Sequence, residues 1–336
     1  MAPLPDNTTL TCPEHMKDFP EDSKKVVLSN AISDVFEIRS VLGRGRGLFA
    51  RINIAQGQLI AAETPFFTLP SIANFNITPE DLLQKFFALS LTEQQQFRAL
   101  HDRNAEAVPS LLGIVHTNAL DIDSNLDGIF PNFSFLNHSC VPNAHYSWNG
   151  NLEKGTLYAI DDIKKGSEIT MAYGGYQRGH WNFICSCETC ASSSYELRRG
   201  DIKRARITTL QNEIIERAEI QHEGCLKDLR EMKELLQDVY GNSTGAVLAC
   251  VYFIASEVAA SQSDLARSSV FAERAYGERL MCEGEDHPFV LKYGEVRDDL
   301  TLHYGFASTN FRETQVDTVP VVLGGEDFED WLWTWE

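Results

Sequence analysis

The stretch Phe130–Gly150, FPNFSFLNHSCVPNAHYSWNG, places an amide, an imidazole, a hydroxyl and a thiol directly after an apolar segment. These groups belong to Asn137, His138, Ser139 and Cys140, and the proline that follows two residues later ends any regular element. Such a run is typical of a buried polar cluster, a metal site or a binding site. The rest of the sequence decides among these three.

Three more cysteines lie close together further along the chain, in the order Cys185-Ser-Cys187-Glu-Thr-Cys190. Thiolates bind zinc tetrahedrally, and one loop with this spacing can supply several of them. Three thiolates leave one corner of the tetrahedron, which either water or a distant residue fills, and Cys140 is the candidate residue. We therefore expect a closed, structural zinc site. A disulfide within the group is the alternative, which a reducing compartment disfavours.

The composition is that of an ordinary protein with a sizeable core. The chain has 336 residues, 43% of them hydrophobic and 23% charged, enough for two or more domains. It has no apolar run of the roughly 18 residues that a membrane helix needs, and its first residues lack a signal-peptide pattern. We expect an intracellular protein, in the nucleus, the cytoplasm or both. The net charge of −19 argues against direct binding to nucleic acid and suits a basic protein partner.

Strand-like and helix-like segments alternate along the first part of the chain. Residues 35–69 and 129–173 combine β-branched and aromatic residues with punctuating glycines, which predicts short antiparallel strands. The expected strands of the second stretch lie in GIFPNFSFL, AHYSWNG, GTLYAIDDI and SEITMAY, and a Lys-Lys-Gly turn joins the last two. Residues 71–120 begin with a Thr-Pro-Glu-Asp helix start and carry helical periodicity. Two or three helices are therefore expected as an insertion into a β-rich unit.

The rest of the chain has a different character. Residues 196–310 carry helical periodicity in four or five long segments, which would suit a degenerate tetratricopeptide-like (TPR-like) stack. Residues 1–30 are polar and are expected to form a poorly ordered arm. Residues 311–336 form an acidic, aromatic tail that either docks or stays mobile.

The segment GRGRGLFA, residues 43–50, allows two interpretations. From Gly45 to Ala50 it matches the dinucleotide fingerprint, and Glu63 lies at the distance of its ribose-binding acid. That fingerprint requires a helix next, whereas the following FARINIAQGQLI favours a hairpin. We therefore expect a glycine turn between strands, where missing side chains let a ligand approach the backbone.

Taken in order, four motifs resemble the SET domain, the fold of protein-lysine methyltransferases. They are GRGRGLFA, FSFLNHSCVPN, KKGSEITMAY and NFICSCETC, within about residues 35–190. The insertion and the segment CEGEDHPFV resemble the SET-and-MYND (SMYD) branch. No cysteine lies between Cys12 and Cys140, so the MYND zinc finger has no ligands here, as in fungal-type SET proteins.

The resemblance implies an α+β fold, a β-clip of short antiparallel sheets with a helical insertion. It predicts a SET domain over residues 31–174 with the insertion at about 71–120, and a post-SET zinc motif over 175–195. An all-α, TPR-like domain over 196–310 and the tail 311–336 complete the prediction.

The resemblance also implies S-adenosylmethionine as methyl donor and a lysine of a histone or another protein as acceptor. Tyr173 would be catalytic, at the meeting point of sulfonium and amine. The implied cofactor-binding residues are Arg44, Gly45, Arg46, Gly47, Asn118, Asn137, His138, Tyr173 and Phe183, and the implied metal ligands are Cys140, Cys185, Cys187 and Cys190.

The cofactor residues divide by the part of the cofactor that they would bind. The two arginines, the glycine backbone and Asn118 would hold the amino-acid end, since arginine suits a carboxylate. Asn137 and His138 would bind the amine and the adenine, and Phe183 would stack on the adenine ring.

Three points stay open at this level. A catalytically weak SET scaffold that serves protein interaction is the alternative to an enzyme, and a zinc-stabilised reader of histone tails is a third reading. Met171 stands where many relatives have an aromatic residue, which leaves the number of methyl groups transferred open. Tyr176 and Trp181 are candidates for lining the lysine channel.

Overall fold

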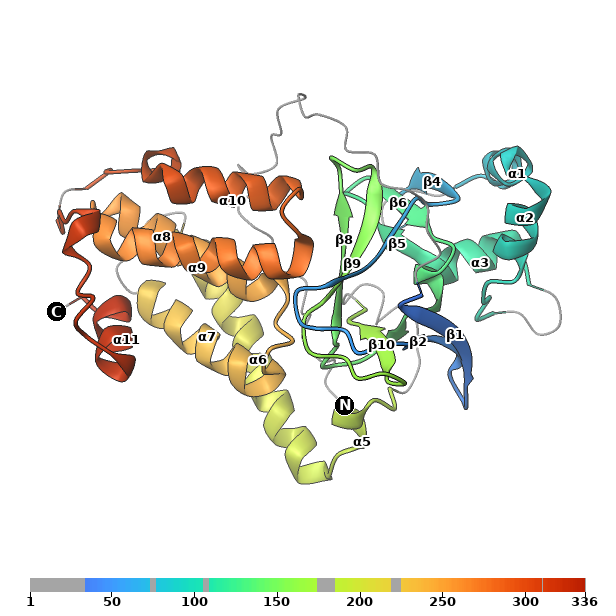
Figure 1. The fold of residues 1–336 in the computed structure, drawn as a ribbon, viewed down its shortest axis with the longest axis horizontal. Coiled ribbons are helices and arrows are strands. Elements are labelled where there is room, and N and C mark those ends of the chain that lie inside the picture. Colours follow the sequence, from blue (N-terminus) through green and yellow to red (C-terminus); the bar gives the residue numbers. More distant parts are fainter. Residues whose placement is uncertain are drawn as a thin grey trace. The chain divides into compact units, whose positions relative to one another are not determined.

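The structure is a computed structural model that describes residues 34–72, 77–104, 109–173, 185–218, 225–309 and 311–335. The chain divides into two compact units, with the boundary between Cys187 and Glu188. The strands and the helices α1 to α3 belong to the first unit, and the long helices to the second (Figure 1). This boundary falls inside the predicted post-SET motif, and the predicted domain limits stay predictions.

Three small sheets build the strand unit. The first has the order β1-β2-β10-β7, the second β3-β9-β8 and the third β4-β6-β5. The strands are β1 Phe36–Val41, β2 Gly45–Ala50, β3 Leu59–Glu63, β4 Phe67–Pro70, β5 Ala119–Asp121, β6 Leu126–Ile129, β7 Asn137–His138, β8 Ala144–Asn149, β9 Lys154–Ala159 and β10 Glu168–Met171. The predicted β-clip of short sheets is confirmed, although β7 and β10 pair in parallel.

The glycine-rich segment forms a hairpin, as expected. β1 and β2 pair antiparallel from Phe36–Ala50 to Val41–Gly45, and Gly43 and Gly45 both have positive φ. No helix follows among the described residues until α1, so the dinucleotide interpretation is wrong. Glu63 has a different task, because its carboxylate accepts the backbone N–H groups of Asn132 and Phe133.

That contact explains one wrong prediction. The strand expected in GIFPNFSFL ends at Ile129, and Phe133–Phe135 instead form a turn of 3-10 helix. Strand propensity describes a local preference, whereas the Glu63 carboxylate fixes the backbone of this turn from a strand distant in sequence.

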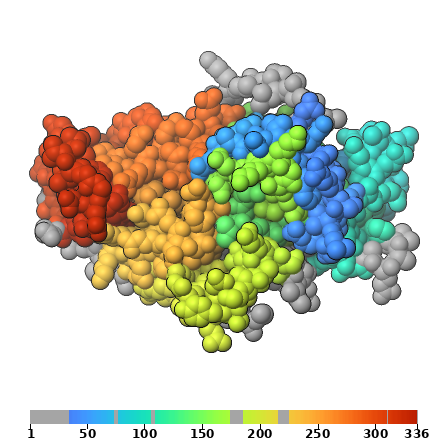
Figure 2. All heavy atoms as spheres, turned by 60° about the horizontal axis from the view of Figure 1, so that its bottom comes forward, coloured from blue at the N-terminus to red at the C-terminus, as the bar shows by residue number. Residues whose placement is uncertain are grey.

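The described part of the insertion contains α1 Pro79–Ala88, α2 Leu91–Arg98 and α3 Leu111–Asn118, in line with the two or three helices expected. Thr78 caps α1, where Pro79 is the first helical residue, and Ser90 and Glu93 form a capping box at α2. A core that includes Phe86 packs these helices on the β4-β6-β5 sheet. Figure 2 shows them beside the strands of the same unit.

The second unit consists of consecutive helices that pack on one another. They are α5 Glu188–Ala191, α6 Ser194–Ala218, α7 Cys225–Tyr240, α8 Ala246–Ser261, α9 Leu265–Glu283, α10 Pro288–Asp298 and α11 Gly325–Trp333. Successive pairs from α6 to α10 are neighbours, which fits the expected stack of helices. From Leu248 to Ser261 every residue of α8 is buried, so it is the central helix. None of the described helices has the length and apolar character to cross a membrane.

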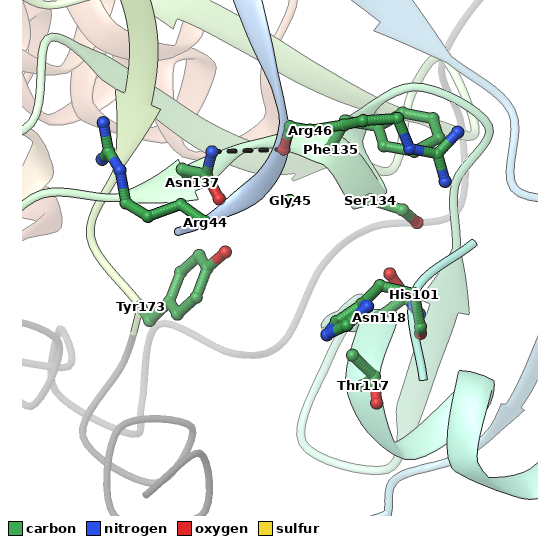
Figure 3. A pocket seen from close by; sticks show the side chains of 10 residues that line it. All are labelled: Arg44, Gly45, Arg46, His101, Thr117, Asn118, Ser134, Phe135, Asn137 and Tyr173. Atoms are coloured by element: carbon green, nitrogen blue, oxygen red, sulfur yellow. Dashed lines mark hydrogen bonds between the residues drawn. The ribbon is translucent and has the colours of Figure 1, made fainter. Parts of the chain in front are cut away.

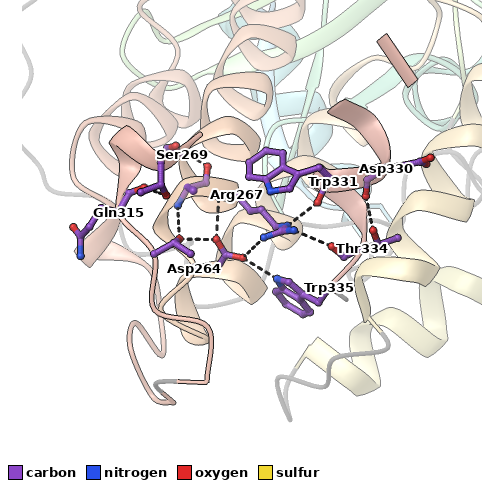
Figure 4. Close-up of polar contacts among 11 residues, drawn as sticks. Asp264, Arg267, Ser269, Gln315, Asp330, Trp331, Thr334 and Trp335 are labelled. Carbon is purple, nitrogen blue, oxygen red and sulfur yellow. Dashed lines mark hydrogen bonds and ion pairs between the residues drawn. The ribbon is translucent and has the colours of Figure 1, made fainter. Parts of the chain in front are cut away.

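The last part of the acidic tail, α11, docks on the helical unit, whereas Phe311, Val321 and Val322 earlier in the tail are exposed. Leu332 and Trp333 of α11 are buried, and Trp333 packs edge-on against Phe271 with ring centroids 4.6 Å apart. Arg267 donates to the carbonyls of Trp331 and Thr334, which ties the end of the chain to α9 (Figure 4).

Candidate cofactor pocket and cysteine cluster

A pocket in the strand unit collects most of the predicted cofactor-binding residues. Arg44, Gly45, Arg46, Asn118, Asn137 and Tyr173 line it, together with His101, Thr117, Ser134 and Phe135. Tyr173 and Asn137 stand on one side and His101, Thr117 and Asn118 on the other (Figure 3). The hairpin, the insertion and the two polar motifs therefore meet at one place.

The two arginines have different partners. Arg44 Nη2 donates to Glu168 Oε2 at 2.6 Å, so a neighbouring carboxylate balances its charge. Arg46 contacts neutral groups, since its guanidinium lies 4.4 Å from the ring centroid of Phe135 and donates to the carbonyl of Ala99. Of the two, Arg46 is better suited to attract an anionic ligand group.

Asn118 lies at the end of α3 and is 6% exposed. Its Nδ2 donates to the carbonyls of His101 and Ile114, both at 2.7 Å. Because both amide protons are used in this way, Oδ1 is the atom of this side chain that can accept from a ligand. The bond from Asn118 Nδ2 to the His101 carbonyl also fixes the backbone of His101, which lines the pocket.

Asn137, on the opposite wall of the pocket, also uses both of its amide protons within the protein. Its Nδ2 donates to Glu168 Oε1 at 2.7 Å and to the carbonyl of Arg46 at 3.2 Å, which leaves Oδ1 as acceptor. Gly47 lies against this pair, because a Cβ there would stand 2.5 Å from Glu168 Oε1 and 2.9 Å from Asn137 Nδ2. Gly47 does not line the pocket itself; its lack of a side chain lets the strand approach Asn137.

Tyr173 follows β10 at the mouth of this arrangement. Its hydroxyl donates to the carbonyl of Leu136 at 2.6 Å. Burial of the hydroxyl and the nearby charge of Glu168 raise the pKa of Tyr173, although Arg44 opposes this. The phenol therefore stays protonated at neutral pH, and towards an incoming group its oxygen can act as acceptor.

His138 does not line the pocket. Its Nδ1 accepts the backbone N–H of Tyr173 at 3.0 Å, and its Nε2 lies 3.4 Å from Cys140 Sγ. The imidazole thus lies between a cysteine and the backbone of Tyr173. Phe183, Tyr176 and Trp181 fall outside the described residues.

Sequence reasoning missed four lining residues, which are His101, Thr117, Ser134 and Phe135. Thr117, Ser134 and Phe135 are neighbours of predicted residues, so adjacency was an available signal. His101 had none, because a hydrogen bond from Asn118 places its loop.

The four predicted metal ligands come together. Their sulfur atoms all lie within 4.8 Å of one another, those of Cys140, Cys185, Cys187 and Cys190. None of them is in a disulfide, and Cys140 and Cys187 are buried. Four converging thiols match the donor set of a closed tetrahedral site, so this cluster can hold a metal ion.

Comparison with known proteins agrees with this geometry. The SET domain family model matches residues 45–174. Histone-lysine N-methyltransferase set5 of Schizosaccharomyces pombe is 24% identical over 284 residues, which cover 81% of this chain and 86% of that protein. Histone-lysine N-methyltransferase SET5 of Candida glabrata is 32% identical over 144 residues, covering 40% of this chain and 26% of that protein.

A human relative, N-lysine methyltransferase SMYD2, is 25% identical over 131 residues, which cover 33% of this chain and 30% of that protein. The chain thus spans about a quarter to a third of the length of two of these three relatives, and most of the first. The family match covers β2 of the hairpin, the insertion, the Asn137-His138 turn and Tyr173. Together, the match and the pocket identify this part of the chain as a SET domain.

Proposed function

We propose that this protein is an S-adenosylmethionine-dependent protein-lysine N-methyltransferase that acts on histones or other basic proteins. One observation carries the cofactor assignment. On opposite walls of the pocket, Asn118 and Asn137 use their amide protons inside the protein and offer carbonyl-type oxygens to a ligand. Two acceptors suit an ammonium group, and Arg46 on the same pocket suits a carboxylate.

The residues present fit the amino-acid end of this cofactor, which carries both of these charges. Arg46, Asn118 and Asn137 would hold it, with the backbone of Gly45 alongside. When bound, S-adenosylmethionine supplies an electrophilic methyl group. Arg44 contributes indirectly, because its ion pair orients Glu168, which in turn holds the amide of Asn137.

Tyr173 is the proposed catalytic residue. With its proton donated to Leu136, the phenol oxygen is directed to accept a hydrogen bond from the substrate amine. Its raised pKa makes it a poor general base at neutral pH, so its part is to position the amine. A lysine that enters an apolar site loses its proton more readily, because burial lowers the pKa of an amine.

His138 enters the proposal as a positioning residue. Its ring joins the thiol of Cys140 to the N–H of Tyr173. We infer that the cysteine cluster holds zinc and that this metal, through His138, keeps Tyr173 in place. Zinc in a four-cysteine site has a structural task.

The overall charge supports a basic substrate. At −19, the net charge favours the approach of a positively charged protein such as a histone tail.

Purified protein, labelled S-adenosylmethionine and a panel of histones and cell lysate test the activity. Wild-type protein should label a protein substrate, and Tyr173→Phe should transfer methyl groups about 100-fold more slowly while still binding the cofactor. Tyr146→Phe is the matched control, because the Tyr146 hydroxyl donates to the Asp121 carbonyl and does not line the pocket. Cofactor binding by calorimetry without any transfer would favour the scaffold reading, and neither binding nor transfer would refute the proposal.

Elemental analysis tests the metal. One zinc per chain is expected, lost in the double variant Cys187→Ser, Cys190→Ser and kept in Cys225→Ala, a buried cysteine outside the cluster. A wild-type protein without metal, or zinc retained by the double variant, would contradict the assignment.

A further inference from the structure

We propose that Asp121 and Asp127 share one proton and that this pair makes the hairpin behind the cofactor pocket sensitive to pH. The two residues stand directly opposite each other, on β5 and β6. Like charges in opposite positions of a sheet destabilise it, so two ionised carboxylates here need a neutralising group.

The surroundings of Asp127 explain why a proton is the fitting group. Its side chain is 1% exposed, and Oδ2 accepts the backbone N–H of Ile72 at 2.7 Å. Its other oxygen, Oδ1, is buried and has no hydrogen-bond donor among the described residues. A buried carboxylate oxygen without a donor is unfavourable. A proton on Oδ1, donated to the Asp121 carboxylate, satisfies both groups and leaves the bond from Ile72 intact.

No cation takes that place in the described part of the chain. Neither aspartate forms an ion pair there with a lysine, arginine or histidine. The groups that face the pair are the Ser71 hydroxyl beside Ile72 and the phenol of Tyr146 on β8, which donates to the Asp121 carbonyl at 3.0 Å. A divalent cation favours more than two carboxylate ligands. Among the described residues no third carboxylate lies close enough to Asp121 and Asp127 to share such an ion.

The direction of the pKa shift agrees with this geometry. Burial raises the pKa of Asp127 to about 6, and the charge of Asp121 adds to the rise, while the bonds from Ile72 and Ser71 oppose it. Asp127 would therefore lose the shared proton near pH 6.

The position of the pair connects it to the pocket. β5 follows directly after Asn118, and β6 leads into the turn that carries Ser134 and Phe135. In the view of Figure 1 this hairpin is drawn between α3 and the strands β8 and β9. The carboxylate of Asp127 also holds Ile72, where the chain leaves β4 towards the insertion. Repulsion within the pair therefore acts on the segments that bring Asn118, Ser134 and Phe135 to the pocket.

The sign follows from linkage. Because the folded protein binds the Asp127 proton more tightly than the unfolded chain, this group stabilises the fold below about pH 4, and that stabilisation is lost as pH rises towards 6. The folding equilibrium changes by at most roughly 100-fold across this window. Above this pH window both carboxylates are ionised, so the repulsion between Asp121 and Asp127 no longer changes with pH.

The test is the thermal midpoint of wild type and Asp127→Asn at pH 5 and pH 8. Asparagine can donate from Nδ2 to Asp121 and accept from Ile72 at any pH. We expect Asp127→Asn to unfold several degrees above wild type at pH 8, with a smaller difference at pH 5. Asp123→Asn, in the same hairpin, removes one charge outside the pair and should show no such pH-dependent difference; Asp123 Oδ1 accepts the N–H groups of Asn125 and Leu126.

Two outcomes would overturn the proposal. One is that neither Asp127→Asn nor Asp121→Asn is more stable than wild type at pH 8. The other is a rise in the wild-type midpoint at pH 8 on adding Ca²⁺ or Mg²⁺ that Asp127→Asn lacks, because the pair would then bind a cation. The reciprocal variant Asp121→Asn, whose amide can donate to ionised Asp127, should reproduce the stabilisation even if Asp127→Asn folds poorly.

The consequence for the pocket rests on the proposed function and has its own readout. S-adenosylmethionine should bind wild type more weakly at pH 8 than at pH 5.5, and this difference should shrink in Asp127→Asn. Unchanged midpoints would refute the shared proton, whereas a cofactor that binds at neither pH would instead count against the proposed function.

Discussion

The two units of this protein use their buried polar groups in opposite ways. In the helical unit, buried Arg279 pairs with buried Glu283 at 2.8 Å, so one buried charge balances another. In the strand unit, Asn118 and Asn137 pair their donors with protein groups and keep their acceptors for the pocket.

This difference separates structural from functional polarity. A buried group whose partners are supplied by the same unit stabilises the fold, and its removal leaves the remaining partner unsatisfied. A buried group that leaves its acceptor oxygen without a protein donor stabilises the fold less, but that oxygen is available to a ligand. Substitutions in the two units should accordingly change different quantities.

The largest effect is expected from Arg279→Met in the helical unit. Removing one partner of a buried ion pair costs about 3–5 kcal/mol, because Glu283 stays behind as a buried charge. Urea unfolding should show this loss, while the affinity for S-adenosylmethionine stays unchanged. Arg297→Met is the control, because Arg297 pairs with exposed Asp298 and Glu273 and should cost about 0–1 kcal/mol. A parallel loss of cofactor affinity in Arg279→Met would remove the distinction between the units.

An intermediate effect, on binding, is expected from Asn118→Ala. Losing a hydrogen bond to a charged ligand group should weaken the binding of S-adenosylmethionine roughly 10- to 100-fold. Methylthioadenosine, which lacks the amino-acid end, should bind wild type and variant alike in calorimetry. Asn53→Ala serves as control, since Asn53 accepts the N–H of Lys165 and does not line the pocket. If both ligands weaken equally, Asn118 only shapes the loop of His101.

The smallest effect is expected from Glu329→Gln on α11. Burial raises the pKa of this carboxyl, but the bonds and charges of Arg274, Trp333 and Lys233 outweigh it and lower the pKa to about 2. Its contribution is therefore complete above about pH 4.5 and is lost as pH falls towards 2. The variant should lose about 1–2 kcal/mol at pH 7, after allowance for solvent screening, and less at pH 3.

Chemical unfolding at the two pH values measures this difference, with Glu326→Gln as control. Glu326 is exposed in the first turn of the same helix. An equal loss in both variants at pH 7 would mean that the ion pairs of Glu329 add nothing.

Much of the strand unit could be predicted from the sequence because its motifs are short and carry their own chemistry. The hairpin with Gly45, the Asn137-His138 turn and the converging cysteines were all expected. The structure places Gly45 and Asn137 in one pocket and the four cysteines in one cluster. The roles assigned to the individual residues stay predictions.

What the sequence did not reveal depends on contacts between distant segments. His101 reaches the pocket through a bond from Asn118, and Phe135 lies under the guanidinium of Arg46. The Phe133–Phe135 turn looked like a strand because its aromatic residues favour strands, and the Glu63 carboxylate decides otherwise. A local motif also does not reveal that both ring nitrogens of His138 face protein groups, and the role of His138 towards the cofactor stays a prediction.

The order β1-β2-β10-β7 has a consequence for biosynthesis. β10 lies between β2 and β7, and the Arg44–Glu168 pair joins residues 124 positions apart in sequence. Such distant contacts form slowly, and this sheet cannot close before the ribosome has released β10. A nascent chain that ends before Glu168 would lack β10 and expose the edges of β2 and β7. The pocket is therefore completed late in synthesis, and a prematurely terminated SET domain should be a target for chaperones rather than a weak enzyme.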